Sequence, residues 1–398
     1  MAGLYIHIPF CESRCIYCGF YSTTSLKLRD AYVDALIKEM SLRPIHQELE
    51  EGEKIETVYL GGGTPSQLTG EQLIKLFDGI NKYLGHFTRD MEITMECNPD
   101  DITEEFCLTL KQLPVNRISM GAQTFSNERL RFLHRRHNAQ EVRIAVERLR
   151  NIGINNISID LMFGFPGENI EQWSSDIQEV ISLNVEHISA YSLMYEEGTS
   201  LYRLLEQGKI EEIDEEMSRN MYDTLIQLLT KTGYEHYEIS NFARPGYRSR
   251  HNSSYWHETP YIGIGAAAHS YKRIHKGGQL FATRSWNIAQ LAQYIEKIEQ
   301  GTLPSEKEEL DINTRYNDLI ATALRTSDGI SIKHVAEEFG EELTRQLTSE
   351  AQKHIARGLM KIENDHLSLT PKGLYVSDDI MRLRTLHCWA VRVAARLH

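Results

Sequence analysis

The chain has 398 residues, of which 43 are basic and 56 acidic, so its formal net charge is −13 at pH 7. This acidic balance argues against a general nucleic-acid binder, although it leaves room for a local basic patch. The length suits one large domain with an appendage, or two domains. Because the sequence has neither a basic, apolar leader nor an apolar run of about 18 residues, we expect no signal peptide, no membrane span and a cytoplasmic location.

The first element is an apolar run that leads into three closely spaced cysteines. Residues 4–8 are typical of a strand, and residues 9–25 form a loop with Cys11, Cys15 and Cys18 in the spacing C-x3-C-x2-C. Three thiolates on one loop can hold an iron–sulfur cluster and leave one iron open to a small ligand. A structural zinc site usually has four protein ligands, and no fourth ligand lies at a suitable spacing. Six cysteines in the whole chain are too sparse to favour a disulfide framework.

Strand and helix patterns then alternate along the first half of the chain. We expect strands near residues 4–8, 57–60, 91–96, 117–120, 156–161 and 187–193. We expect helices near residues 28–42, 70–84, 103–112, 126–150 and 170–183. Repeated β-α units with right-handed crossovers predict an α/β fold, a partial (β/α)6 TIM-like barrel that stays open. A doubly wound sheet is the competing topology.

Polar residues or glycines recur where these strands end. The carboxyl ends of barrel strands form one mouth, so the cysteine loop, Gly61–Thr64, Glu96, Gln123 and Asp160 are predicted to lie together. Each position alone also fits a structural role, such as a turn or a helix cap. A glycine-rich backbone lets a ligand approach closely, Glu96 suits an ammonium group, Arg135 a carboxylate and Asp160 ribose hydroxyls.

The second half of the chain is less regular. A helix is expected near 215–232 and a strand near 234–239, followed by a loop over 244–270 that is rich in glycine, histidine and aromatic residues. Three further helices and a hairpin resemble a winged-helix module; they are expected at 314–326, 331–339, 342–357 and 359–369. This module lacks the dense basic stripe that nucleic-acid binding requires, so a lid or a partner-docking role is favoured.

These elements divide the chain into four predicted parts. They are a barrel (1–240), a connecting segment (241–312), a mainly helical winged-helix-like domain (313–380) and an atypical basic tail (381–398). The tail has no acidic residue from Arg382 onward, unlike the chain before it, and is left out of the functional argument.

The cysteine motif, with the aromatic Tyr17 before its third cysteine, resembles the signature of the radical S-adenosylmethionine (SAM) superfamily. The segments YIHIPFC, YLGGGTPS, SMGAQTF and DLMFGFPG resemble its branch related to oxygen-independent coproporphyrinogen III oxidase, over nearly the whole chain. The resemblance implies a [4Fe–4S] cluster on Cys11, Cys15 and Cys18, and reductive cleavage of SAM to a 5′-deoxyadenosyl radical. It implies a SAM site lined by Tyr5, Tyr17, Gly62, Gly63, Thr64, Glu96, Gln123, Arg135 and Asp160.

Two departures separate this chain from the oxidases. They carry a further cysteine two residues after the third, where this chain has Phe20, and they have a long segment before the motif, where Cys11 here is already near the start. Both features are similar to the sister group of heme chaperones, HemW. That group has an HNxxYW motif implicated in heme binding, which corresponds here to His251, Asn252, Tyr255 and Trp256. From the residues alone, core aromatics and an ordinary loop histidine are the favoured explanation of this segment, and the family resemblance reverses that preference.

The resemblance therefore implies a heme chaperone that binds heme and passes it to apo-hemoproteins, with a possible transient partner in a membrane. Oxygen-independent coproporphyrinogen III oxidase activity, a dehydrogenase-type oxidative decarboxylation, is the second expectation. A radical SAM enzyme with another substrate is the third. The cluster and SAM are expected in all three cases.

Overall fold

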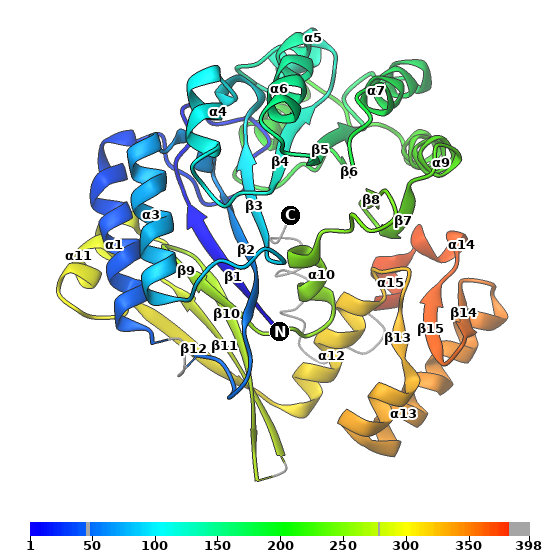
Figure 1. Cartoon of the computed structure of the whole chain (residues 1–398). Coiled ribbons are helices and arrows are strands. Elements are labelled where there is room, and N and C mark those ends of the chain that lie inside the picture. Colours follow the sequence, from blue (N-terminus) through cyan, green and yellow to red (C-terminus); the bar gives the residue numbers. More distant parts are fainter. Residues whose placement is uncertain (45–47, 278, 382–398) are drawn as a thin grey trace.

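One large sheet organises the molecule (Figure 1). The computed structural model describes residues 1–44, 48–277 and 279–381, so the predicted tail lies almost wholly outside the described residues. The strands of the large sheet, in order across it, are β12 (Ser305–Leu310), β11 (Gln279–Asn287), β10 (His269–Lys276), β9 (Tyr261–Ile264), β1 (Ala2–Ile8), β2 (Ile55–Gly62), β3 (Glu92–Cys97), β4 (Arg117–Gln123), β5 (Asn156–Phe163), β6 (His187–Ser192), β8 (Asn241–Ala243) and β7 (Glu235–Glu238).

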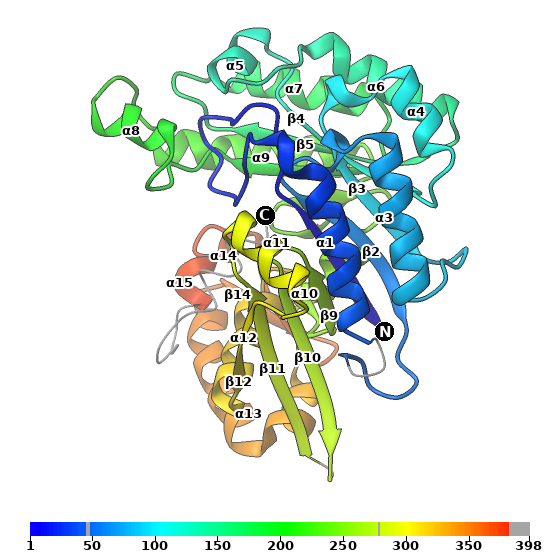
Figure 2. The same cartoon turned by 90° about the vertical axis from the view of Figure 1, so that its left-hand side faces the viewer.

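Strands β1 to β6 are parallel neighbours in chain order. A doubly wound sheet would reverse its strand order at a switch point, and this sheet does not do so across these six strands. The prediction of a partial (β/α)6 barrel is therefore confirmed. Helices cover its outer face (Figures 1 and 2), and they are α1 (Arg29–Leu42), α3 (Gly70–Tyr83), α4 (Glu104–Leu110), α5 (Asn127–Phe132), α6 (Ala139–Asn151), α7 (Ile170–Ser182) and α9 (Glu215–Lys231).

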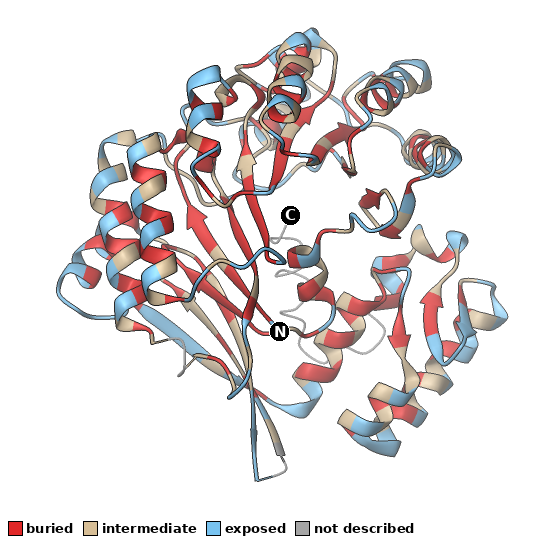
Figure 3. Ribbon diagram, in the orientation of Figure 1, coloured by how far each residue is buried: buried red, intermediate tan, exposed pale blue. Residues whose placement is uncertain are grey.

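Alternation along β1 determines what lies on each side of the barrel wall. Leu4, Ile6 and Ile8 are fully buried in the main hydrophobic core beside α1 and α3. Burial of each such side chain stabilises the fold by about 1.5–3 kcal/mol. The intervening Tyr5 and His7 point to the inner side, where they contact other polar and aromatic groups. Figure 3 shows β1 to β5 mostly buried, whereas exposed residues lie on the outer helices and along β10 to β12.

Capping residues explain where the outer helices begin. Thr69 and Gln72 form a capping box at the start of α3, and Asn169 and Gln172 form another at the start of α7. Each box satisfies two backbone N–H groups that the first helical turn leaves unpaired. The sequence signals for these starts lie close to the observed boundaries for this reason.

The segment 241–312 supplies strands β8 to β12 of the large sheet. The expectation of a loop over 244–270 was wrong, because this stretch contains α10 (Arg250–Trp256) and β9. Strand β9 reads Tyr-Ile-Gly-Ile, a run too short and too interrupted to stand out, and it is fixed by pairing with β1. The division of the chain at residue 240 stays a prediction, and the sheet itself continues across it.

Shorter elements connect these parts. Helix α8 (Ser200–Glu206) follows β6, and α11 (Leu291–Glu299) lies between β11 and β12. Single 3-10 turns occur at Leu26–Leu28, Pro65–Gln67 and Pro99–Asp101. Within the described ranges, no helix combines the length and the apolar character needed to cross a membrane.

The C-terminal module is mainly helical, as expected. It consists of α12 (Ile312–Ala323), β13 (Ile330–Ser331), α13 (Ile332–Ala356), β14 (Met360–Glu363), β15 (His366–Leu369), α14 (Pro371–Leu374) and α15 (Ser377–Met381). Helix α13 is broken at Gly340 (φ 84°, ψ 171°), where the sequence predicted two helices. Asn364 and Asp365 have positive φ and close the predicted hairpin with a tight turn.

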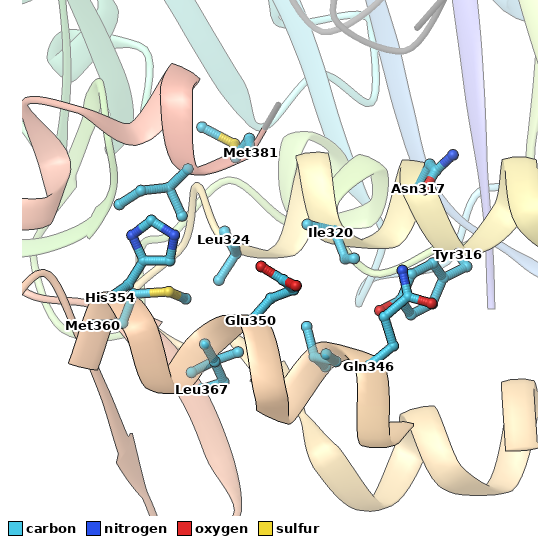
Figure 4. A pocket seen from close by; sticks show the side chains of 13 residues that line it. Tyr316, Asn317, Ile320, Leu324, Gln346, Glu350, His354, Met360, Leu367 and Met381 are labelled. Atoms are coloured by element: carbon cyan, nitrogen blue, oxygen red, sulfur yellow. The ribbon is translucent and has the colours of Figure 1, made fainter. Parts of the chain in front are cut away.

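A small cavity lies inside this module, between α12, α13 and α15 (Figure 4). Its lining is mostly apolar, with His354 and Glu350 on one wall. None of the residues predicted to bind a cofactor or heme lines it. The predicted sites therefore have to be sought in and around the barrel.

Candidate functional site

The cysteine loop is held against the glycine-rich end of β2. The Thr64 N–H donates to the Phe10 carbonyl (2.8 Å), and the Gly63 N–H donates to the carbonyl of Ile8 (2.9 Å). On its other side the loop is fixed between α5 and α8, because the Ile16 N–H donates to a carbonyl at the end of α5 and its carbonyl accepts from a backbone N–H in α8. The three cysteines thus project from a backbone that is anchored on both sides.

Cys11, Cys15 and Cys18 are partly exposed free thiols. The Cys11 Sγ lies 3.5 Å from the Thr64 Oγ1, and the Arg135 Nη1 donates to the Cys15 Sγ over 3.5 Å. Burial raises the pKa of Cys11 and raises that of Cys18 to about 11, so these two thiols are protonated at neutral pH until a metal displaces the proton.

The spread of the thiols bears on which metal group they suit. Throughout the part of the chain that the structure describes, no three His, Cys, Asp or Glu side chains converge as a single metal ion requires. Three thiols distributed over one loop match the ligand set of an iron–sulfur cluster with an open iron.

The glycines after β2 allow close packing that other residues would prevent. Gly62 has φ 106°, and a Cβ there would collide with the His7 ring. A Cβ on Gly63 would lie 2.7 Å from the Ile8 carbonyl oxygen, and one on Gly61 would lie 2.8 Å from Glu96. The backbone can approach both the cysteine loop and a ligand at the mouth because these side chains are missing.

Two carboxyl groups line the inner wall of the mouth. Glu96 accepts hydrogen bonds from the Tyr59 hydroxyl (2.7 Å) and the Gly62 N–H (3.1 Å), and burial raises its pKa to about 7. Asp160 accepts from the Ser119 hydroxyl (3.4 Å), and burial raises its pKa to about 6. Near neutral pH both the charged and the neutral forms of these two carboxyl groups are therefore populated, and a nearby cation would favour the charged forms.

Arg135 completes the mouth. Its Nη2 donates to the Gly121 carbonyl (2.6 Å) and to the Asn98 Oδ1 (2.7 Å), while its buried Nε has no hydrogen-bond partner among the described residues. Gln123, with φ 66°, folds back toward Gly121, whose added Cβ would meet its Nε2 at 2.7 Å. The cysteine loop, β4 and the segment after β3 thus contact a guanidinium whose Nε has no partner among the described residues.

The two predicted tyrosines occupy different depths. Burial and the neighbouring Cys15 raise the pKa of Tyr17, which lies beside Arg135 and the cysteines. Tyr5 lies deeper, where its hydroxyl donates to the His7 Nδ1 (3.0 Å) and its ring stacks on Tyr59 at 6.3 Å. The donor assignment follows from the His7 Nε2, which faces the Tyr21 carbonyl and so carries the proton.

The HNxxYW motif lies on α10, which packs against the inner side of β1 and β2. His251 is 1% exposed. Its Nδ1 lies 2.8 Å from the Thr57 Oγ1, its Nε2 lies 2.9 Å from the Tyr255 hydroxyl, and its ring stacks on Tyr59 at 5.1 Å. Burial lowers the pKa of His251 to about 3, so its imidazole is neutral. Both ring nitrogens are engaged within the protein.

The other motif residues are also part of the packing. Trp256 is 1% exposed, and the Arg325 guanidinium of the C-terminal module lies 5.3 Å from its ring. Asn252 is half-buried, and its N–H donates to the Ser249 Oγ. The structure therefore brings the three cysteines and the predicted SAM-site residues other than Tyr5 to the mouth, and places the motif deeper, near the amino-terminal halves of β1 and β2.

Three residues in these networks were missed from the sequence. Thr57 and Tyr59 alternate with Gly61 along β2, and this period-two pattern would have placed them on the inner face. Asn98, which precedes a proline and accepts from Arg135, was given no role in the sequence analysis.

Comparisons with known proteins identify the class to which this fold belongs. Residues 5–180 match the radical SAM superfamily, and residues 310–376 match the HemN C-terminal domain. The fold matches the solved structure of coproporphyrinogen III oxidase (HemN) from Escherichia coli with a TM-score of 0.79 and 24% identity, over 96% of this chain and 89% of that one. These findings define a radical SAM protein with a HemN-type C-terminal domain.

Full-length relatives define the family further. The chain is 35% identical to "Heme chaperone HemW" of Bacillus subtilis over 96% of this chain and 98% of that protein. It is 32% identical to the protein of the same name from Lactococcus lactis, over 94% and 95% of the two chains. The chain belongs to the HemW family of the radical SAM superfamily.

Proposed function

We propose that this protein is a heme chaperone that holds a [4Fe–4S] cluster and SAM at the barrel mouth, binds heme through the α10 motif and passes it to apo-hemoproteins. The observation that carries the proposal is the match, over nearly the whole chain, to relatives named heme chaperone. The two sites described above supply residues suited to each ligand.

Cys11, Cys15 and Cys18 are the proposed cluster ligands. When bound, the cluster and SAM supply the reductive chemistry that the superfamily shares. Glu96 is placed to accept the ammonium group of SAM, and the unused Arg135 Nε is available to an anionic group such as its carboxylate. Asp160, on the neighbouring strand, is suited to ribose hydroxyls.

The remaining predicted residues shape the SAM site. Gly62, Gly63 and Thr64 provide a close backbone, and Tyr17 and Gln123 lie near Arg135. Tyr5 supports the interior wall through His7.

His251 is the proposed heme ligand, with Asn252, Tyr255 and Trp256 around the macrocycle. Because its imidazole is neutral at physiological pH, it can coordinate iron without first losing a proton. Coordination requires one ring nitrogen to leave Thr57 or Tyr255, so heme binding must move α10 or the His251 ring. The bound state therefore differs locally from the structure described.

Heme titration tests this proposal. We expect wild-type protein to give a Soret band with saturable binding, and His251→Ala to weaken heme binding by about tenfold or more. His257→Ala is the matched control, because His257 is exposed at the end of the same helix. Equal heme affinity of wild type and His251→Ala would remove His251 from the site.

The second candidate is oxidative decarboxylation of coproporphyrinogen III. The residue that disfavours it is Phe20, which stands where the oxidases have a further cysteine. Anaerobic incubation of the cluster-loaded protein with SAM, a reductant and coproporphyrinogen III distinguishes the two. Formation of protoporphyrinogen IX would refute the chaperone proposal.

A further inference from the structure

Side-chain contacts join the two predicted sites through the barrel interior. The His251 ring stacks on Tyr59 at a centroid distance of 5.1 Å and an interplanar angle of 23°. The Tyr59 hydroxyl donates to the Glu96 Oε1 over 2.7 Å. Tyr59 therefore contacts one residue of the proposed heme site and one residue of the proposed SAM site.

Both ends of this connection are tightly constrained. The second Glu96 oxygen accepts from the Gly62 N–H, and this glycine cannot carry a side chain beside His7. At the other end, the His251 N–H donates to the Glu92 Oε1 over 2.9 Å, while Thr57 and Tyr255 hold its ring. Buried side chains that are packed and hydrogen-bonded in this way cannot move independently.

We propose that Tyr59 couples the two sites, so that SAM bound at Glu96 holds His251 in its buried position and weakens heme binding. The inference rests on the proposed function. An ammonium group beside Glu96 favours the ionised carboxylate, which accepts the Tyr59 hydrogen bond more strongly than the neutral acid. The Tyr59 ring is then held against His251, and displacing the imidazole for heme costs more.

Linkage makes this effect reciprocal. If SAM lowers the affinity for heme by a given factor, heme lowers the affinity for SAM by the same factor. SAM would thus act as a release signal for heme, in addition to any role in radical chemistry.

The first test measures both affinities on the full, cluster-reconstituted chain without oxygen. We expect saturating SAM to weaken heme binding by about fivefold or more, and saturating heme to weaken SAM binding by the same factor. Tyr59→Phe keeps the ring stack and removes the hydroxyl, so the coupling should fall below about twofold. Heme is followed by its Soret band and SAM by equilibrium dialysis.

Tyr234→Phe is the matched control. Tyr234 is a buried tyrosine whose hydroxyl donates to the Val185 carbonyl, near the other edge of the sheet. The Tyr234→Phe variant loses one buried hydrogen bond, as Tyr59→Phe does, and should keep the full coupling between SAM and heme. Unchanged or tighter heme binding in the presence of SAM, or equal coupling in Tyr59→Phe and wild type, would overturn the inference.

A second measurement needs no heme. Diethyl pyrocarbonate modifies accessible neutral imidazoles, and mass spectrometry reports the modification at His251. SAM should slow this modification in wild type and in Tyr234→Phe, but not in Tyr59→Phe. Protection by SAM in a protein that binds no heme would support the coupling and refute the proposed heme site. Heme binding without SAM-dependent protection would refute the coupling and leave the proposed function standing.

Discussion

The barrel mouth and the α10 motif hold their candidate ligand-binding side chains in opposite ways. At the mouth, three thiols are partly exposed and the buried Nε of Arg135 has no partner among the described residues. At the motif, His251 is 1% exposed and both of its ring nitrogens are hydrogen-bonded. The mouth therefore offers groups that are free to engage a ligand, whereas the motif would have to open before His251 could bind one. The predictions below test this contrast, from the largest effect to the smallest.

Removal of one of the three loop thiols should abolish cluster binding at the mouth. We expect Cys15→Ala to lose the cluster completely, since the remaining two thiolates cannot hold it. Iron content and the brown absorbance after anaerobic reconstitution measure this. Cys107→Ala, which removes a buried thiol from α4, should retain both.

Substitution of Glu96 should have a smaller effect than the loss of a cysteine, and this effect should depend on pH. Because the pKa of Glu96 is about 7, its charged form, and with it the affinity for SAM, should increase between about pH 6 and pH 8. Glu96→Gln should bind SAM about tenfold or more weakly at pH 8 and show no such increase. Equilibrium dialysis at several pH values provides the measurement, and a pH-dependent variant would contradict the assignment.

Weakening the contacts that hold His251 should make its imidazole more available to a ligand, as the groups at the mouth already are. Thr57→Val leaves the His251 Nδ1 without its partner, so the free energy of unfolding should fall by about 1–3 kcal/mol. Heme affinity should rise by several-fold, because less has to be broken to free the imidazole. Thr94→Val is the control, since the Thr94 Oγ1 is buried without a hydrogen-bond partner among the described residues. Denaturant melts and heme titrations measure the two effects, and tighter heme binding in the control would contradict this explanation.

The smallest effect concerns the contact between the C-terminal module and the end of α10. The His334 Nε2 lies 3.4 Å from the Glu258 Oε2, and this hydrogen bond raises the pKa of His334. Glu338 also raises the pKa of His334, whereas burial and Arg273 lower it. Stabilisation by this pair is thus complete below the unfolded pKa of about 6.5 and is lost as pH rises through the higher folded value.

His334→Gln should therefore lower the melting temperature more at about pH 6 than at pH 8. Because the His334 side chain is 43% exposed, the contribution is only about 0.5 kcal/mol after solvent screening. Equal loss at the two pH values would show that the ion pair contributes nothing.

The sequence predicted the parts of the fold that depend on local signals. Strands β1 to β6, the capped helices α3 and α7 and the Asn364–Asp365 hairpin all carry such signals. Strand β12 does not, because its sequence Ser-Glu-Lys-Glu-Glu-Leu has no apolar alternation and its strand geometry depends on pairing with β11. The same limit explains why β9 was taken for part of a loop.

The residues of the candidate site fall into the same two groups, those that the sequence pattern predicts and those that depend on tertiary packing. Residues at strand ends were predicted because parallel strands bring their carboxyl ends to one edge, whatever the distance along the chain. Thr57 and Tyr59 were missed because their roles depend on His251, which follows about two hundred residues later and reaches them only through tertiary packing. The burial of His251 depends on this packing, so the short HNxxYW pattern does not predict it.

The pairing of β1 with β9 also has a consequence for biosynthesis. It joins residues 3–6 to residues 261–264, whereas β1 to β6 pair with neighbours along the chain. Contacts between such distant segments form late, and chains emerge from the ribosome with the amino-terminal part first. The six parallel strands and the cysteine loop can therefore assemble on the nascent chain before β9 exists. One edge of β1 then stays unpaired until residues 261–264 have been made and can pair with it.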